Sequence, residues 1–187
     1  DNPLNTEQLL ALAIEIEGHP DNVAPALLGS CVLNFPESQT WRYLPVPENV
    51  YLGVCIPDFE LSTASARAVL PAHITHHDAV LNTSYLSGLV TALFTQDLPL
   101  LAQSLCDKLH QEYRAELVPG MKQVMQAALD AGALACVLSG AGPTLLVFWQ
   151  EKEAEISVAM QKTWRKFGIQ ADFVSCLIDH NGAICLD

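Results

Sequence analysis

The last third of the chain carries the pattern that most limits its fold: apolar runs of strand length, separated by glycine turns and one amphipathic helix. Residues 151–167 repeat apolar positions at helical spacing, and Gly168 ends this helix. Asn181-Gly182 is a good signal for a hairpin turn. Strands are expected at residues 133–138, 144–149, 173–178 and 183–186.

The preceding stretch adds another strand and several helices. Residues 50–56 form an apolar run of strand length. Helices are expected after Thr75 or Asp78, from Asp97 through Leu109, and at residues 121–131. With this helical insert set aside, the order is strand, helices, strand, strand, helix, strand, which is that of the ferredoxin-like split βαβ fold. The sequence thus predicts an α+β class with helices on one face of a sheet, and this fold decides no function by itself.

The first 47 residues form a separate part of the pattern. Helices are expected from Asn5 to Gly18 and from Asp21 or Asn22 to Leu28, followed by a strand at residues 31–35. Gln8, three residues after Asn5, favours a capped start of the first helix. Residues 36–47 hold three prolines and few apolar residues in register. We therefore expect two domains, residues 1–47 and residues 48–187.

The charge of the chain excludes several classes of partner. With a net charge of −12, the surface repels phosphate backbones and anionic lipids, so neither nucleic acid nor a membrane is an expected partner. A site for a phosphate must then be organised locally, by backbone N–H groups, Mg²⁺ or a few arginines. No apolar run approaches the roughly 20 residues that span a bilayer, and no signal peptide is visible.

The six cysteines indicate a protein with reduced thiols. No two of them lie within four residues of each other, which excludes a CxxC metal or redox pair. Four stand in strand-like runs and are expected as buried free thiols: Cys55, Cys136, Cys176 and Cys185. We therefore expect a cytoplasmic protein. Its first residues, Asp1-Asn2-Pro3, look like the middle of a polypeptide.

A dense polar cluster lies between the two N-terminal helices. Glu17, His19, Asp21 and Asn22 stand within six residues. Two interpretations stay open for this cluster. Gly18 and Asp21 suit the end of one helix and the start of the next. Glu17 also suits a hard cation, and polar groups near a helix N-terminus suit a ligand.

A glycine-rich loop joins the first two strands of the last third of the chain. Its sequence is SGAGPT, residues 139–144. The two glycines permit positive φ and close backbone approach, so the N–H groups of the loop can turn toward an anion or another loop. A tight connection between strands explains the same residues, because Gly and Pro make such turns routinely.

Two arginines end segments that leave the predicted core. They are Arg67 and Arg114, in a chain with only nine basic residues. A planar guanidinium suits the bidentate capture of a carboxylate or a phosphate. Surface ion pairs, with Glu112 or Glu116, are the other interpretation, and such pairs contribute little energy.

Four stretches stand out together: EGHPDNVAPALLG (17–29), FELSTASARAVLP (59–71), HQEYRAELVPG (110–120) and SGAGPTLL (139–146). The first three resemble, in the same order, segments of bacterial homoserine kinases. The last resembles the third motif of the wider GHMP kinases, the galactokinase, homoserine kinase, mevalonate kinase and phosphomevalonate kinase group. The resemblance covers essentially the whole chain.

The resemblance implies an ATP-dependent kinase that uses Mg²⁺ to phosphorylate the hydroxyl of L-homoserine, a step of threonine biosynthesis. It implies that Glu17 holds Mg²⁺ and that Asn22 binds the reacting hydroxyl. Contacts with the substrate are implied for His19, Asp21, Thr63, Arg67 and Arg114. Support of the loop that binds the nucleotide phosphates is implied for Ser139, Gly140, Ala141 and Gly142. No residue is an obvious general base, so catalysis by alignment is expected.

The resemblance also implies a phosphate-binding loop, Pro-x-x-x-Gly-Leu-Gly-Ser-Ser, which does not occur in these 187 residues. We therefore expect the sequence as given to be a C-terminal portion of the enzyme and not to phosphorylate homoserine by itself. A mevalonate-type or sugar kinase stays open, as does a catalytically dead module that binds an amino acid as a regulator. Asp21 with two arginines favours an amino acid as ligand. A homodimer is left open as well.

Overall fold

The computed structural model describes residues 4–35, 37–38 and 40–184 of the 187-residue chain. The chain forms two compact units: a first unit of Asp1–Val46 with Ile178–Asp187, and a second unit of Pro47–Leu177. The end of the chain thus belongs to the first unit, whereas the expected boundary after residue 47 assigns it to the second domain. The division into residues 1–47 and 48–187 as family domains stays a prediction.

The first unit contains two helices and an antiparallel pair of strands. They are α1 (Thr6–Glu17), α2 (Pro20–Leu28), β1 (Cys31–Phe35) and β2 (Thr40–Leu44). The predicted capped start of α1 is confirmed. Asn5 Oδ1 accepts the N–H of Gln8 at 2.9 Å, and Gln8 Oε1 accepts the N–H of Asn5 at 3.0 Å. Gly18 ends the helix in the left-handed conformation.

The core of the first unit is small, and the C-terminal segment lies against its second helix. The buried core residues are Leu10, Ala24 and Leu28. Beyond the end of α2, Ser30 N donates to the carbonyl of Asp179 at 2.6 Å. Ala183 N donates to the carbonyl of Leu27 at 3.1 Å. These backbone bonds attach residues of the chain end to α2.

Strand β2 is the element of the first unit that the sequence analysis missed. Three prolines make residues 36–47 resemble a linker, yet Thr40–Leu44 pairs with β1 along its whole length. Trp41 lies opposite Asn34, and Tyr43 lies opposite Val32. Aromatic residues favour strands, which explains the pairing. The strand expected at 183–186 is absent at residues 183 and 184, and residues 185 and 186 lie outside the described residues.

The second unit combines a four-stranded sheet with helices. Its strands are β3 (Tyr51–Pro57), β4 (Ala135–Leu138), β5 (Leu145–Trp149) and β6 (Ala171–Cys176). Its helical elements are α3 (Thr63–Ala68), α4 (His76–Thr95), α5 (Leu98–Ser104), α6 (Gln111–Arg114), the 3-10 turn η1 (Ala115–Leu117), α7 (Met121–Asp130) and α8 (Glu153–Arg165).

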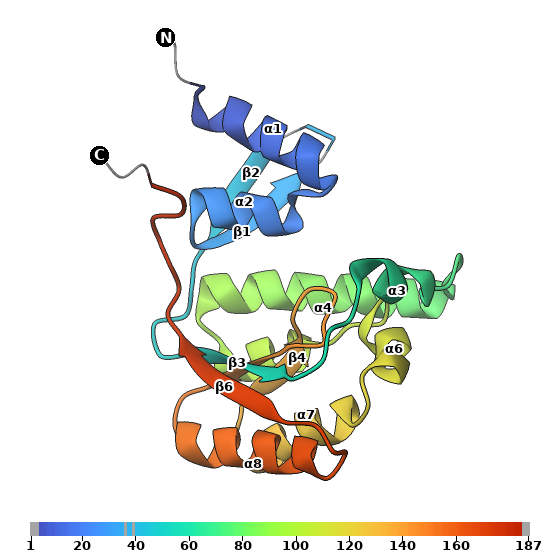
Figure 1. Cartoon of the computed structure of the whole chain (residues 1–187). Coiled ribbons are helices and arrows are strands. Elements are labelled where there is room, and N and C mark those ends of the chain that lie inside the picture. The colour runs from blue at the N-terminus through green and yellow to red at the C-terminus, as the bar shows by residue number, and fades with distance from the viewer. Residues whose placement is uncertain (1–3, 36, 39, 185–187) are drawn as a thin grey trace. The chain divides into compact units, whose positions relative to one another are not determined.

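The sheet of the second unit has the predicted topology. Its strands run in the order β4-β5-β3-β6, and every neighbouring pair is antiparallel. This is the split βαβ order, and the α+β class is confirmed. Figure 1 shows α7 and α8 on one side of the sheet and α4 along the other. The expectation of helices on one face is therefore wrong for α4, because a helical pattern does not specify which face of a sheet the helix covers.

The main core lies between the sheet and the pair α7 and α8. Alternate residues of β3 and β5 point toward these helices, because successive side chains of a strand lie on opposite faces. The buried set includes Cys55, Val124, Ala128, Leu145, Val147, Trp149, Ile156, Met160 and Trp164. Helix α8 thus buries one face, as its apolar spacing predicts.

Two cysteines of this core are buried free thiols, as the sequence predicts. Burial raises the pKa of Cys55 to about 11 and that of Cys136 to about 12, so both thiols stay protonated at neutral pH. Cys176 is only partly buried, and Cys185 lies outside the described residues. Within the described part of the chain, no helix has the length and apolar character needed to span a membrane.

Candidate functional site

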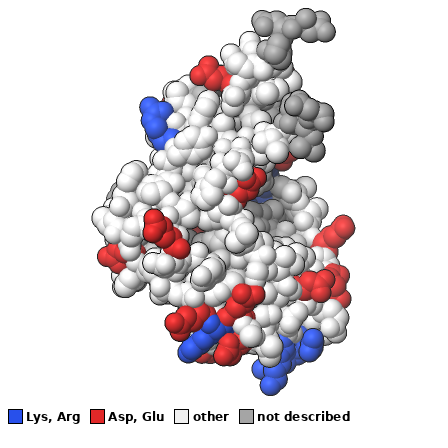
Figure 2. Space-filling model, turned by 90° about the vertical axis from the view of Figure 1, so that its left-hand side faces the viewer, with Lys and Arg blue, Asp and Glu red and all other residues white. Residues whose placement is uncertain are grey.

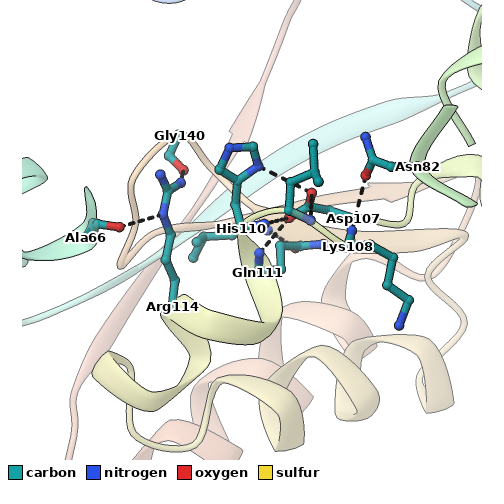
Figure 3. A network of polar contacts seen from close by, with 10 residues as sticks. Ala66, Asn82, Asp107, Lys108, His110, Gln111, Arg114 and Gly140 are labelled. Atoms are coloured by element: carbon teal, nitrogen blue, oxygen red, sulfur yellow. Dashed lines mark hydrogen bonds and ion pairs between the residues drawn. The ribbon is translucent and has the colours of Figure 1, made fainter. Parts of the chain in front are cut away.

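Arg114, the last residue of α6, joins segments that are far apart in the sequence (Figure 3). Its Nε donates to the carbonyl of Ala66 in α3 at 3.1 Å. A terminal nitrogen of the guanidinium donates to the carbonyl of Gly140, in the glycine loop, at 2.9 Å. A guanidinium has five N–H donors, so Arg114 keeps donors for a further partner.

Arg67 and Thr63 lie on α3, the helix whose backbone Arg114 binds. The hydroxyl of Ser62 caps this helix, Thr63 is its first residue, and Arg67 stands in its last turn. Both Thr63 and Arg67 are exposed. Because Arg114 binds the carbonyl of Ala66, α6 is fixed beside the residue that precedes Arg67. The structure therefore brings the two arginine-bearing helices together with the glycine loop.

The ion pairs considered for Arg114 are not formed in the described part of the chain. Glu112 instead pairs with Lys108, with 2.5 Å between Oε1 and Nζ. Across residues 4–35, 37–38 and 40–184, neither Arg67 nor Arg114 has a carboxylate within 4.0 Å. No protein carboxylate in this part of the chain therefore neutralises either guanidinium.

The glycine loop, residues 139–144, is a tight turn between β4 and β5. Ser139 N donates to the carbonyl of Thr144, and Gly142 N donates to the carbonyl of Ser139, both at 2.9 Å. Gly140 and Gly142 have φ values of 54° and 87°, which residues with a side chain rarely adopt. The turn allowed by the sequence is present, with Ala141 between the two glycines. Its support of a phosphate-binding loop stays a prediction.

The segment between α5 and α6 contains site residues that the sequence analysis missed. The helix expected across residues 97–109 ends at Ser104. The carboxylate of Asp107 then accepts three backbone N–H groups at the start of α6. They belong to Leu109 at 2.9 Å, His110 at 2.8 Å and Gln111 at 2.5 Å. Asp107 thus holds the backbone that leads into a helix of only four residues, whereas the expected long helix would place it in the last helical turn.

The electrostatics of Asp107 favour its ionised form. Burial by itself raises the pKa of this carboxyl group. The backbone N–H donors and His110 lower the pKa by more than burial raises it, so the pKa of Asp107 lies below its ordinary value. The Nδ1 atom of His110 lies 3.3 Å from Asp107 Oδ1. A charged carboxylate is also the stronger acceptor for these N–H groups.

Gln111 connects the same short helix to the strand that enters the glycine loop (Figure 3). Its Oε1 accepts the N–H of Leu138, the last residue of β4, at 2.6 Å. On the other side of Asp107, the N–H of Lys108 donates to Asn82 Oδ1 in α4 at 3.1 Å. Side chains of α4 and α6 therefore fix the segment around Asp107 and the start of the loop.

The polar cluster of the first unit lies at the junction of α1 and α2. Glu17 is the last residue of α1, and His19 directly precedes α2. Asp21 and Asn22 are the second and third residues of α2. All four side chains are exposed, so they are available to a ligand.

The expectation that Asp21 or Asn22 begins the second helix is wrong. Helix α2 begins at Pro20, whose fixed φ suits the first helical position. His19 precedes it without a capping hydrogen bond from its side chain. Asp21 Oδ1 accepts the N–H of Asn22 at 3.1 Å, which stays within the first turn. Capping therefore does not explain Asn22.

ATP and Mg²⁺ are the groups that the resemblance implies. Among the described residues, no three His, Cys, Asp or Glu side chains gather into a metal site of their own. Mg²⁺ usually keeps several waters and binds through one or two carboxylates and the phosphates of a substrate. The exposed carboxylate of Glu17 fits a metal that is shared with a nucleotide in this way.

The charged surface is mainly acidic. On the face drawn in Figure 2, Asp and Glu side chains are widely spread, and Lys and Arg occupy few places. With a net charge of −12, the chain offers no general attraction to an anion. An anionic group of a ligand must therefore rely on local donors such as Arg67 and Arg114.

Comparisons with known proteins show which proteins have sequences similar to this chain. The family model of the GHMP kinases C terminal matches residues 89–166. A homoserine kinase from Microchaete diplosiphon is 47% identical over 188 residues, which cover 99% of this chain and 61% of the relative. The chain is homologous to the homoserine kinases. Another homoserine kinase, from Carboxydothermus hydrogenoformans, is 43% identical over 187 residues, with 99% of this chain and 61% of the relative covered.

Solved structures agree with this homology. The crystal structure of a homoserine kinase from Cytophaga hutchinsonii matches with a TM-score of 0.90 and 35% identity, over 97% of this chain and 60% of that one. A galactokinase from Lactococcus lactis matches with a TM-score of 0.61 and 12% identity, which indicates a shared fold alone. The chain thus spans about three fifths of the length of the relatives that it matches.

The two glycines of the loop should differ in their tolerance of a side chain. A Cβ at Gly142 would lie 2.8 Å from Leu138 Cδ1, whereas a Cβ at Gly140 would meet nothing within 4 Å. Gly140→Ala should lower the free energy of unfolding by about 1 kcal/mol, through left-handed strain. Gly142→Ala should lower it by about 2–3 kcal/mol, because overpacking adds to the strain. Urea unfolding measures both, and equal losses would contradict the packing of Leu138 against Gly142.

Proposed function

We propose that the protein containing this chain transfers the γ-phosphoryl group of ATP to the hydroxyl of L-homoserine and forms O-phospho-L-homoserine. The observation that carries this proposal is the homology to homoserine kinases across 99% of the chain, which includes the polar cluster of the first unit, both arginines and the glycine loop. The contacts of Arg114 support it as well, since they join α6 to the glycine loop and to α3, the helix that carries Arg67.

The residues proposed to contact the substrate carry the charges that a zwitterionic amino acid requires. Arg67 and Arg114 would bind the carboxylate, because a guanidinium offers two parallel donors to its oxygens. Asp21 would bind the ammonium group, with His19 beside it, and Thr63 would lie at the edge of the site. The free guanidinium donors and the exposed carboxylate of Asp21 are available for these roles.

The proposed catalytic contribution of the chain is alignment and charge neutralisation. Asn22 would hold the reacting hydroxyl through its side-chain amide, and Glu17 would hold Mg²⁺. Bound Mg²⁺ bridges the phosphates of ATP and neutralises charge that develops during transfer. Ser139, Gly140, Ala141 and Gly142 would brace the loop that binds the nucleotide phosphates. None of these residues removes a proton as an obvious base, and phosphoryl transfer through a loose transition state depends mainly on positioning.

This activity would place the protein in the cytoplasm, in threonine biosynthesis, with ATP and L-homoserine as its small-molecule partners. The buried, protonated thiols of Cys55 and Cys136 fit a reducing compartment. Neither nucleic acid nor a membrane is a proposed partner, in view of the net charge of −12.

The test is the substrate range of the protein expressed from the whole open reading frame around this sequence. ADP release should require L-homoserine, and mevalonate and galactose should give none. Two matched analogues sharpen the assay: 4-hydroxybutanoate lacks the ammonium group, and 3-aminopropan-1-ol lacks the carboxylate. Both should be poor substrates, since each analogue leaves charged groups of the proposed site without their partner in the complex, which costs binding energy. Turnover of mevalonate or galactose instead, or binding of homoserine with no ADP release, would refute the proposal in favour of another kinase or a regulatory module.

A further inference from the structure

The short helix α6 is part of the site, but no sequence motif explains why so short a helix forms. A helix of four residues is too short to be stable by itself, because the cost of nucleation is spread over few hydrogen bonds. Two of its side chains nevertheless hold the glycine loop. Gln111 accepts the N–H of Leu138 at the start of the loop, and Arg114 donates to the carbonyl of Gly140 inside it.

We propose that Asp107 and Gln111 are positioning residues that place Arg114 and the glycine loop for phosphoryl transfer; this inference rests on the proposed kinase function. Asp107 acts first, through the backbone. Its carboxylate satisfies the N–H groups of Leu109, His110 and Gln111, which have no partner within the helix at its N-terminus. Asp107 therefore fixes the backbone at the start of this single turn.

Gln111 and Arg114 act next, through their side chains. They are three residues apart, so they lie on the same side of one helical turn. The atoms they bind, Leu138 N and Gly140 O, are two residues apart at the entry to the loop. A rotation of this turn would move both contacts together. The same rotation would displace Arg114 from the carbonyl of Ala66, next to Arg67.

The chain supplies two matched controls. Asp97 also caps a short helix of the second unit, since its Oδ1 accepts the N–H of Leu100 at 2.9 Å, but α5 holds no residue of the proposed site. Asp97→Ala therefore removes an aspartate that accepts a backbone N–H at the start of another short helix, as its N-cap residue. For Gln111, two variants are compared. Gln111→Leu removes the side-chain oxygen that accepts the N–H of Leu138, whereas Gln111→Glu keeps an oxygen on a side chain of the same length.

The experiment combines two measurements on the protein expressed from the whole open reading frame. NMR-detected hydrogen exchange at Leu138 reports on the loop without any substrate. Steady-state kinetics report KM and kcat for homoserine and ATP. Gln111→Leu should speed exchange at Leu138 by roughly two- to tenfold, since the one hydrogen bond to Gln111 is lost. Asp107→Ala should also speed it, since the turn that carries Gln111 loses three backbone hydrogen bonds. Both variants should lower kcat/KM by roughly 10- to 100-fold, because small misplacements of a bound group are costly. Asp97→Ala and Gln111→Glu should leave both quantities near the wild-type values.

The outcomes separate this inference from the function on which it rests. Fast exchange at Leu138 with unchanged kcat/KM overturns the inference and leaves the kinase function standing. An equal effect of Asp97→Ala also overturns it, since any lost cap would then suffice. If Asp107→Ala fails to fold, the comparison of Gln111→Leu with Gln111→Glu still tests the inference, because it changes only one half-buried side chain. A wild-type protein that phosphorylates no alcohol overturns the proposed function and this inference with it.

Discussion

Replacing Arg67 or Arg114 with alanine should lower kcat/KM for L-homoserine by roughly 30- to several-thousand-fold, which corresponds to about 2–5 kcal/mol of transition-state binding. Each guanidinium is free of protein carboxylates in the described part of the chain, so its charge is available to a substrate. Lysine should restore little at either position, because an ammonium group lacks the planar fork of donors. The measurement is steady-state kinetics with homoserine and ATP varied separately.

The structure makes the two variants distinguishable. Arg67 is exposed and, among the described residues, donates no hydrogen bond to the glycine loop, so its loss should affect homoserine and leave the KM of ATP near the wild-type value. Arg114→Ala also removes the bond to Gly140, so a smaller effect on ATP should accompany the loss for homoserine. Arg165→Ala, an exposed arginine of α8, is the matched control. Arg67→Ala should turn over 3-aminopropan-1-ol as the wild type does, since this analogue has no carboxylate. Arg114→Ala should show with this analogue only the smaller loss that follows from its contact with the glycine loop. A variant that keeps its kcat/KM for homoserine would identify that arginine as a surface residue.

The parts of the fold that could be predicted from the sequence are those with a local signal. The capping box of Asn5 and Gln8 lies within four residues, and the apolar spacing of α8 is regular over its length. Strand order followed from the order of elements, since the split βαβ pattern permits few arrangements. The face covered by α4 and the pairing of β2 could not be predicted in this way, because both depend on contacts with segments distant in sequence.

The residues of the candidate site also differ in whether a local sequence signal identifies them. Motifs identified residues that would touch a ligand, such as Arg114 and Asn22, from their similarity to a family. Asp107 and Gln111 were missed for a physical reason. An aspartate ahead of a helix is an ordinary capping signal, but the apolar spacing of Leu101, Leu105 and Leu109 favoured one continuous helix that hides it. The bond from Leu138 N to Gln111 Oε1 spans 27 residues and leaves no local pattern.

Asn22→Asp should abolish most of the kcat for homoserine while the protein keeps a melting temperature close to that of the wild type. Asn22 is the third residue of α2, and its side chain is exposed. A negative charge in the first turn of a helix is favourable by roughly 0.3–1 kcal/mol, so the folded state loses little. In the proposed site, the same change removes an N–H₂ donor from the reacting hydroxyl and adds a carboxylate beside Asp21. Two like charges near the transferring phosphoryl group raise the barrier, because that group carries negative charge itself.

The control for this variant is Asn5→Asp in the same unit. Asn5 caps α1 through its side-chain oxygen, and aspartate caps about equally well, so this change adds the same charge without touching the proposed site. Calorimetry and single-turnover kinetics on both variants separate stability from chemistry. Asn5→Asp should keep its kcat, and Asn22→Asp should lose it at an unchanged affinity for ATP. Full activity in Asn22→Asp would exclude a role of the amide in holding the hydroxyl. An equal loss of kcat in both variants would attribute the effect to net charge, and loss through unfolding would make Asn22 a residue of helix stability.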